Sequence, residues 1–350
     1  MADICLITTT IGVPDVLRQY RALDPTVEFI IAGDLKSPHV EIERLCDELG
    51  HARYLSPVAQ MALGYECSPV IGFHSIQRRN IALLEAIKTG ADIVLTIDDD
   101  NAPKQATYFD DLRRAFDGPA GFVVTETARG WFNLGELGQE QFIYRGFPME
   151  YRARRADTSC RLARVPASPG PVGIVNGLIH GDPDINAIER YPDGGPRVYW
   201  YLDEARAGVY VDPRLTMTPI NSQNTAYRRD LAPLAFVLPH VGRYDDIWAS
   251  YIALKCLRHT DDVVLFGPSH VTQARNPHNL VKDLKAELLG MEWTLPLVDW
   301  LESVEGGTTP LERLTAISMA MGARESLAGL PLLPMYRFLR AWLSDVEGVL

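Results

Sequence analysis

Short apolar runs alternate with amphipathic stretches through the first 125 residues of the chain. The runs at residues 4–9, 27–32 and 93–97 have the length and the branched side chains of buried strands, whereas residues 76–88 repeat apolar side chains at helical spacing. Strands that alternate with helices in this way form parallel sheets with crossover helices. The pattern therefore predicts an α/β fold with a mostly parallel, Rossmann-like sheet.

The pattern changes twice further along the chain. Between about residues 130 and 225, Gly, Pro and Arg are frequent and periodicity is weak, which is typical of long loops and short strands around a binding cleft. Helical spacing then returns at residues 280–289, 311–321 and 336–346. We therefore expect a sheet-containing domain over residues 1–280 and a C-terminal helical subdomain over residues 281–350.

The composition fits a soluble globular protein and restricts its partners. Of the 350 residues, 47% are hydrophobic, which suffices for a large core, and no window approaches 18 uninterrupted apolar residues. The net charge of −11 disfavours binding to nucleic acid, which requires many cations. The five cysteines are scattered without a CxxC pair, and the first residues lack the basic region of a signal peptide. We expect a cytoplasmic protein with neither a nucleic acid nor a membrane as partner.

Three adjacent carboxylates, Asp98, Asp99 and Asp100, follow the strand-like run at residues 93–97. Such a cluster is electrostatically unfavourable unless a cation compensates it, and Mg²⁺ or Mn²⁺ typically uses one or two carboxylates together with water and substrate phosphates. His270 follows another strand-like run and is a candidate third ligand. The pattern favours a metal site at Asp98, Asp100 and His270, with a solvated acidic turn and a structural histidine as the alternatives.

Other polar side chains follow the predicted strands directly. Thr8 and Thr10 end the first run, Asp34 follows the second, and Asp99 belongs to the acidic cluster. Ligands of parallel α/β sheets bind at the carboxyl ends of the strands. We therefore expect these four residues to face a ligand.

Four arginines stand where an anionic ligand would use them. Arg78 and Arg79 begin a predicted helix, a place where acidic side chains are usually favoured, so an anion is expected nearby. Arg145 and Arg152 surround a Gly and a Pro, and each offers a planar fork of donors suited to phosphate or carboxylate. Surface ion pairs and stacking on aromatic rings are the alternatives.

A second acid pair, Asp245 and Asp246, lies within a Gly-Arg-Tyr-Asp-Asp-Ile-Trp string. Such a pair can orient hydroxyl groups or act as a base, and one of its carboxyls can have a raised pKa, although acids are also common at the start of a helix. Asn224 ends a polar Asn-Ser-Gln-Asn segment that can bind hydroxyls or cap a helix. The chain has no GxGxxG, GxxxxGK[ST], HExxH or GxSxG motif, so flavin, NAD, P-loop, zinc-protease and α/β-hydrolase chemistry lose support.

Together these segments resemble the reversibly glycosylated polypeptides, a family that includes the UDP-arabinopyranose mutases. The matching strings are Thr96-Ile97-Asp98-Asp99-Asp100, Arg145-Gly146-Phe147-Pro148 with Arg152, Gly242-Arg243-Tyr244-Asp245-Asp246-Ile247-Trp248-Ala249, and His270 with Asn276-Pro277 and Asn279-Leu280. Their order and approximate spacing agree over about residues 3–290, and the short Gly33-Asp34 fits too. The chain departs from the family at Asn101, where the family has Cys, and over residues 176–189, so the sugar and the base stay open.

The resemblance implies a GT-A-like domain over residues 1–280 that binds a nucleoside-diphosphate sugar through Mn²⁺ or Mg²⁺. It also implies interconversion of pyranose and furanose forms of the sugar without flavin or NAD. In the family, the arginine that matches Arg145 is associated with reversible glycosylation. The sequence looks nearer to bacterial members from antibiotic pathways, which act on other nucleotide sugars including a GDP-linked galactose, than to the plant enzymes.

The resulting hypothesis gives each candidate residue a role. The metal ligands bind the diphosphate, Thr8, Thr10 and Asp34 line the nucleoside pocket, and Asp99 binds ribose or an arginine. Arg78 or Arg79 neutralises phosphate charge, and Arg152 and Asn224 bind further parts of the substrate. These residues bind the metal and the substrate, and a separate set of residues is catalytic.

The catalytic residues of this hypothesis are Arg145, Asp245 and Asp246. Asp245 and Asp246 steer hydroxyls or move protons. Arg145 stays protonated and is a poor nucleophile, so holding the departed diphosphate suits it better. A glycosyltransferase that uses the same donor site, and a non-catalytic subunit that binds nucleotide sugar, are the alternative functions, and a homo-oligomer is possible with either.

Overall fold

The structure is a computed structural model of the 350-residue chain, and it describes every residue except 1–2, 153–157, 191–200, 274–278, 325 and 328. Two residues that contribute to the family resemblance, Asn276 and Pro277, lie outside the described residues. Among the described residues, no helix is both long enough and apolar enough to cross a membrane.

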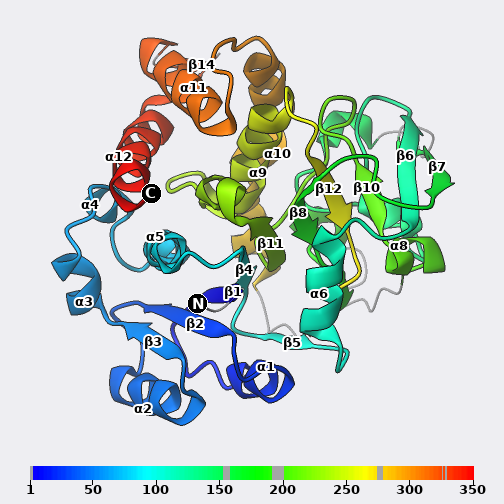
Figure 1. The fold of residues 1–350 in the computed structure, drawn as a ribbon. Helices are drawn as coiled ribbons and strands as arrows, with labels where there is room; N and C mark the ends of the chain where they lie inside the picture. Colours follow the sequence, from blue (N-terminus) through cyan, green and yellow to red (C-terminus); the bar gives the residue numbers. More distant parts are fainter. Residues whose placement is uncertain (1–2, 153–157, 191–200, 274–278, 325, 328) are drawn as a thin grey trace.

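In the part of the chain that the structure describes, ten strands form one central sheet (Figure 1). They are β1 (Ile4–Thr10), β2 (Glu28–Gly33), β3 (Ala52–Leu55), β4 (Ile93–Ile97), β6 (Gly121–Thr127), β7 (Cys160–Val165), β8 (Val172–Asn176), β10 (Val209–Val211), β11 (Asn224–Arg228) and β12 (Val263–Phe266). Their order is β3-β2-β1-β4-β11-β8-β12-β10-β6-β7. The first four strands are all parallel, whereas β11 runs antiparallel to both of its neighbours.

The predicted α/β class with a mostly parallel sheet is therefore confirmed. Parallel pairing also joins β8 to β12 and β6 to β10, and antiparallel pairing joins β10 to β12 and β6 to β7. Separate from this sheet are a small sheet of β5 (Asn101–Pro103), β13 (Val271–Gln273) and β9 (Ile179–Gly181), and a hairpin of β14 (Ser326–Leu327) and β15 (Leu330–Pro331).

Helices cover both faces of the sheet. In chain order they are α1 (Leu17–Leu23), α2 (His39–Leu49), α3 (Pro57–Ala62), α4 (Cys67–Ile71), α5 (Arg79–Thr89), α6 (Tyr108–Phe116), α7 (Ala187–Arg190), α8 (Asp203–Ala207), α9 (Asp245–Leu257), α10 (Leu280–Glu302), α11 (Pro310–Arg324) and α12 (Leu333–Val349). Short 3₁₀ turns are η1 (Ile76–Arg78), η2 (Leu134–Leu137), η3 (Met149–Tyr151), η6 (Arg229–Leu234) and η7 (Gly242–Tyr244).

Alternate residues of β1 belong to two different hydrophobic clusters. Ile4 and Leu6 pack in the cluster that contains side chains of α1, α2 and α6, whereas Cys5 and Ile7 pack in the cluster that contains side chains of α5, α9 and α12. Figure 1 shows α1 and α2 on one side of the β1–β3 edge, and α5 followed by α12 on the other. Because both faces of these strands are buried, their sequence reads as an almost continuous apolar run.

The C-terminal helices share the core of the sheet. Leu301, Leu314 and Trp342 belong to the same cluster as Ile7, and the indole N–H of Trp342 donates to the carbonyl of Pro233. The helices are longer than their sequence pattern indicated, since α10 continues to residue 302 through an internal proline. Residue 280 thus marks a change in secondary structure within a continuous core.

Asp345 of α12 stabilises the start of α4. Its carboxylate accepts hydrogen bonds from the backbone N–H groups of Glu66 and Cys67, at 2.7 and 2.8 Å, which have no partner within their own helix turn. We expect Asp345→Ala to lower the free energy of unfolding by about 1–2 kcal/mol, as the loss of a helix cap does. The measurement is urea unfolding, with Glu347→Ala on the exposed side of α12 as the control. Equal midpoints for the two variants would contradict the capping role.

Candidate active site

The carboxyl ends of β1, β2 and β4 meet at one edge of the sheet. The hydroxyl of Thr10 donates to the carboxylate of Asp99, which joins the end of β1 to the turn after β4. The hydroxyl of Ser37, in the turn after β2, donates to the carbonyl of Thr10 at 2.6 Å. Three segments that follow strands in the sequence thus lie together, as expected for parallel strands.

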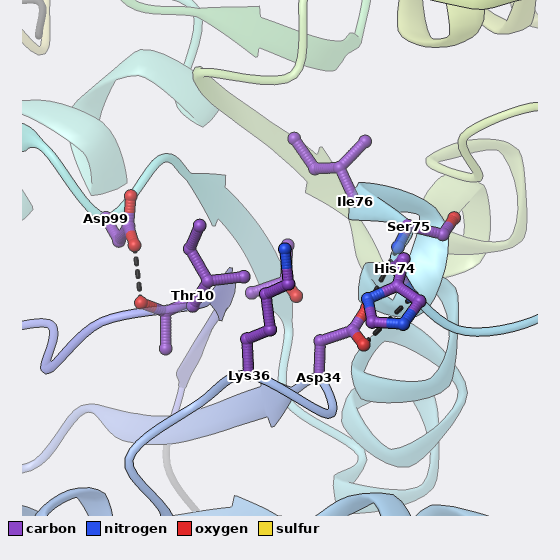
Figure 2. A pocket seen from close by; sticks show the side chains of 9 residues that line it. Thr10, Asp34, Lys36, His74, Ser75, Ile76 and Asp99 are labelled. Atoms are coloured by element: carbon purple, nitrogen blue, oxygen red, sulfur yellow. Dashed lines mark hydrogen bonds between the residues drawn. The ribbon is translucent and has the colours of Figure 1, made fainter.

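A cavity of about 360 Å³ opens at this edge, and we call it the Asp34 cavity (Figure 2). Its lining residues are Thr9, Thr10, Ile11, Asp34, Lys36, His74, Ser75, Ile76 and Asp99. Figure 2 shows the Lys36 ammonium between Thr10 and Ile76. Ile11 and Ile76 are 69% and 48% exposed, so the cavity combines apolar walls with a cation and two carboxylates. A ligand group with both apolar and polar parts fits such a lining.

Asp34 holds the wall of this cavity in place. Its carboxylate accepts hydrogen bonds from the backbone N–H groups of His74 and Ser75, at 2.9 and 2.8 Å. Burial opposes ionisation of Asp34, but these hydrogen bonds outweigh it and lower the pKa of the carboxyl. His74 has a φ of 60°, a left-handed conformation that is strained for a residue other than glycine. The contacts with Asp34 stabilise this conformation.

A second cavity, of about 410 Å³, shares His74, Ser75 and Ile76 with the first, and we call it the Asp245 cavity. Its other lining residues are Gln77, Arg79, Asp98, Asp100, Arg145, Asp184, Ser222, Gln223, Val237, Gly242, Arg243, Asp245, Asp246 and Gln273. Among these described residues, five carboxylates face three guanidinium groups. The lining therefore has an excess of negative charge.

Asp98 and Asp100 enter the Asp245 cavity from the turn after β4. Asp98 pairs with Arg79 at 2.6 Å, and its second oxygen accepts from the side-chain amide of Gln223 at 3.0 Å. Both oxygens of Asp100 lie 3.5 Å from the side-chain amide of Gln273. The acidic cluster is thus an anion of the kind that the arginines at the start of α5 indicated, and Arg79 is the one of the two that contacts it.

Asp245 and Asp246 occupy the first turn of α9. Every residue of α9 is buried, which agrees with its apolar sequence, and acidic side chains at the N-terminus of a helix are favoured by its dipole. The turn before the helix requires Gly242, which has a φ of 67° and lies so close to the carbonyl of Ala286 that a Cβ would clash at 2.2 Å. The helix-start interpretation of this acid pair is correct in position, yet both carboxyls also line the cavity.

Arg145 is buried between carboxylates. Its Nε and one Nη donate to Asp184, at 2.9 and 2.7 Å, the same Nη donates to Asp246 at 3.1 Å, and the other Nη donates to the carbonyl of Arg243. Burial disfavours the charge of Arg145, but Asp184 and Asp246 outweigh burial and raise the pKa of its guanidinium. Arg145 is therefore a permanent cation whose donors are largely engaged by protein groups.

Asp245 has a different environment from its neighbour. Burial raises the pKa of the Asp245 carboxyl to about 7, and the charge of Asp246 adds to the effect, whereas Arg145 and the amide of Gln77 oppose it. Gln77 donates to Asp245 at 2.6 Å. A carboxyl with this pKa both accepts and donates protons near neutral pH, which is the property that general acid–base catalysis requires.

The structure places several candidate residues outside both cavities. Arg78 is fully buried, lines neither cavity and donates to Gln60 and Ser68, so it packs against α3 and α4. Arg152 lines a separate cavity and pairs with Glu189. In both cases the guanidinium bonds to side chains of other segments of the chain, and the local sequence does not reveal these contacts.

Three further candidates also lie outside both cavities. Thr8 is buried within β1, and Asn224 accepts a hydrogen bond from Tyr108 and donates to the carbonyl of Ser269. His270 packs against His180, with ring centroids 4.9 Å apart. Burial and the neighbouring cations lower the pKa of His270 to about 4.

Within the described residues, no group of three or more His, Cys, Asp or Glu side chains can hold a metal ion. Asp98, Asp100 and His270 therefore do not form a three-ligand group. Asp98 and Asp100 together still fit a hard divalent cation that completes its coordination with water and phosphate oxygens. The excess of negative charge around them favours such a cation.

Sequence reasoning missed Asp184, Gln77 and Gln273 among the residues that complete the Asp245 cavity, whereas Ser222 and Gln223 belong to the Asn-Ser-Gln-Asn segment that it marked as able to bind hydroxyls. Asp184 comes from a loop before α7 and is 1% exposed. Gln77 lies beside the arginines in η1, and Ser222, Gln223 and Gln273 are uncharged. For Asp184, the sequence shows only an aspartate in a Gly-Asp-Pro-Asp segment, which is also typical of a turn. Its contact with Arg145 distinguishes it from a turn residue.

No family model and no curated protein sequence matches the chain. Among solved structures, the chain is similar to S. aureus TarS 1-349 in complex with UDP-GlcNAc, with a TM-score of 0.39, 11% identity and coverage of 99% of this chain and 91% of that one. It is also similar to 4-diphosphocytidyl-2C-methyl-D-erythritol synthase from Anaerococcus prevotii, with a TM-score of 0.31, 10% identity and coverage of 83% and 96%. Likenesses this weak carry no argument about activity, so the case for a function rests on the two cavities.

Proposed function

We propose that the chain is a metal-dependent enzyme that binds a nucleotide sugar and interconverts the pyranose and furanose forms of its sugar, without flavin or NAD. The observation that carries this proposal is the junction of the two cavities along residues 74–76. The Asp34 cavity suits the nucleoside, because its walls are partly apolar. The Asp245 cavity suits the sugar, because carboxylates and amides bind hydroxyl groups. The diphosphate then lies between them, beside the acidic cluster.

Asp98 and Asp100 would hold Mn²⁺ or Mg²⁺ in this scheme. When bound, the cation supplies positive charge that stabilises a diphosphate as it leaves the sugar. Two observations support the assignment: oxygen ligands are those that hard cations prefer, and the lining has more carboxylates than guanidinium groups. Arg79 keeps Asp98 oriented and offers a further positive charge.

Asp245 is the proposed proton carrier. When the bond between the anomeric carbon and the diphosphate breaks, a sugar hydroxyl attacks that carbon and gives its proton to ionised Asp245. The former ring oxygen then leaves the carbon and takes this proton back, after which the diphosphate re-forms its bond. No proton is gained or lost over the cycle, so one carboxyl with a pKa near neutrality can serve both steps.

Arg145 and Asp246 have positioning roles in this scheme and take no part in the proton transfer. The pairing of Arg145 with Asp184 and Asp246 favours a positioning role over attack on the sugar, because a guanidinium held between carboxylates stays protonated. It also argues against the clamp on the departed diphosphate that the sequence suggested for this arginine. Asp246 lines the cavity, and its two oxygens accept hydrogen bonds from Arg145 and from the backbone N–H of Ser222, which hold the carboxylate in place.

A glycosyltransferase is the second candidate function. Asp245 is equally suited to deprotonate the hydroxyl of an external acceptor, and the nucleotide end of the site would be unchanged. The two activities differ in their products. An isomerase forms a nucleotide sugar of unchanged mass, whereas a transferase releases nucleotide when an acceptor is present.

Incubation with Mn²⁺ and a panel of UDP- and GDP-linked pyranoses is expected to give an isomeric nucleotide sugar with one of them. The product would have unchanged mass and furanose couplings in NMR, and EDTA would stop its formation until Mn²⁺ or Mg²⁺ is restored in excess. Nucleotide release that depends on an acceptor would instead identify the transferase. Metal-dependent binding of a donor without turnover would leave a binding subunit and reject both catalytic proposals.

A further inference from the structure

Residues 74–77 form a continuous wall between the two cavities, and carboxylates hold this wall at both ends. At one end, Asp34 accepts the backbone N–H groups of His74 and Ser75. At the other end, Gln77 donates through Nε2 to Oδ2 of Asp245 at 2.6 Å. Between these two ends, the hydroxyl of Ser75 donates a hydrogen bond to Oε1 of Gln77 and so links the two sets of contacts. The chain of contacts runs from the nucleoside side of the site to the proposed proton carrier.

The carboxylate of Asp245 decides which end of the Gln77 amide faces it, because an ionised carboxylate only accepts hydrogen bonds. The NH₂ group therefore points to Asp245, and Oε1 accepts from the hydroxyl of Ser75. A donor of this kind stabilises the ionised carboxylate and holds it in one orientation. If the amide were released, Asp245 would lose its hydrogen bond from η1.

The other charged groups around Asp245 come from several elements. Asp246 follows it in α9, and its negative charge opposes ionisation of Asp245, whereas Arg145 favours it. Arg243 of η7 and His74 line the same cavity, and Arg243 pairs with Glu287 of α10. Asp184 reaches Arg145 from the loop before α7. Against this mixed background, Gln77 is the described residue whose side chain donates a hydrogen bond to the Asp245 carboxylate.

We infer that Gln77 is a positioning residue that orients the Asp245 carboxylate toward the bound sugar, and that Ser75 and Asp34 connect this orientation to the nucleoside end of the site. The inference rests on the proposed function for the role of Asp245, but the contacts themselves do not depend on which reaction the enzyme catalyses. Gln77 acts through Asp245 and makes no proton transfer of its own.

The variant Gln77→Leu tests this inference, because it keeps the bulk of the side chain and removes the donor. We expect kcat to fall by about 10-fold to 100-fold near pH 7, since a hydrogen bond to a charged group is lost. KM for the nucleotide sugar should change little. The acidic limb of the pH–rate profile should move to higher pH by about one unit, so part of the loss is recovered in more alkaline buffer. Ser75→Ala should shift the limb in the same direction by a smaller amount.

Gln19→Leu, on the exposed side of α1, is the matched control and should leave both kcat and the pH limb unchanged. A fall in kcat with an unmoved limb, or an equal change in kcat at every pH, would overturn the inference, because a general structural defect gives that result.

A direct titration separates this inference from the proposed function. In protein with ¹³C-labelled aspartate carboxyls, the signal absent from the Asp245→Asn variant belongs to Asp245. Its titration midpoint should rise by about one pH unit in Gln77→Leu. If it does and no substrate is isomerised, the positioning role stands and the proposed reaction falls. If the midpoint stays where it is in the unaltered chain, Gln77 has no such role, whatever the activity.

Discussion

Asp245→Asn is expected to lower kcat for the nucleotide sugar by about 10²–10⁴-fold, the usual contribution of a positioned general acid–base group. The amide has nearly the same shape as the carboxyl and can still bind a sugar hydroxyl, so KM should change much less. The loss arises because the amide cannot take a proton from one hydroxyl and return it to another oxygen. Steady-state kinetics with the isomerised donor provides the measurement, and Asp47→Asn, on the exposed face of α2, is the control.

The pH dependence of Asp245 has a definite sign. Its pKa in the folded chain is raised to about 7, so the ionised fraction, and with it activity that requires a base, should rise with pH up to that range. Stability moves the opposite way. Between the ordinary pKa of about 4 and the raised value, the unfolded chain loses the proton first, so stability falls as pH increases. Asp245→Asn should remove both dependences, and a variant that keeps the full pH–rate limb would exclude Asp245 as the proton carrier.

Asp184→Ala is expected to lower the free energy of unfolding by about 3 kcal/mol, near the lower end of the range for breaking a buried ion pair. The reason is the buried guanidinium of Arg145, which loses three of its hydrogen bonds and, of the described carboxylates that it contacts, keeps Asp246. Chemical unfolding followed by circular dichroism measures the change. The exposed pair of Arg214 and Asp261 offers the control, and Asp261→Ala should cost less than about 1 kcal/mol.

A double variant distinguishes electrostatics from packing in this prediction. If the cost comes from an uncompensated charge, Arg145→Met combined with Asp184→Ala should recover part of the lost stability, because it removes the unpaired guanidinium. The recovery should be incomplete, because the buried Asp246 then loses Arg145 as its partner. If instead the double variant is less stable than either single variant, packing around Asp184 dominates and the electrostatic explanation is wrong.

Neighbouring residues show where sequence reasoning stops. Arg78 and Arg79 have the same side chain and nearly the same local sequence, yet one bonds to Gln60 and Ser68 inside the protein and the other to Asp98 at the cavity. Successive residues of a helix point about 100° apart, so the two guanidinium groups enter different surroundings. No feature of the string itself distinguishes them.

The predicted metal site also shows which features the sequence reveals and which it does not. The acidic cluster could be located from the sequence, because a strand-like run of four apolar residues and Thr96 is followed at once by three aspartates. His270 was added because it also follows a strand-like run, and β13, which begins directly after it, does pair with β5 beside the acidic cluster. The antiparallel register sets Gln273 opposite Asn101 and Val271 opposite Pro103, so Gln273 and not His270 lies beside Asp100.

The sequence by itself determined the strands around β1, the helical C-terminal region, the convergence of strand ends at Thr10, Asp34 and Asp99, and the acid pair at the start of α9. These features follow from local patterns, since buried strands read as apolar runs and parallel strands end at the same edge. Only the tertiary structure decided that Asp184 pairs with Arg145 and that Gln77 contacts Asp245. Those pairs are 39 and 168 residues apart in the chain, and a contact over such a separation depends on how the elements pack.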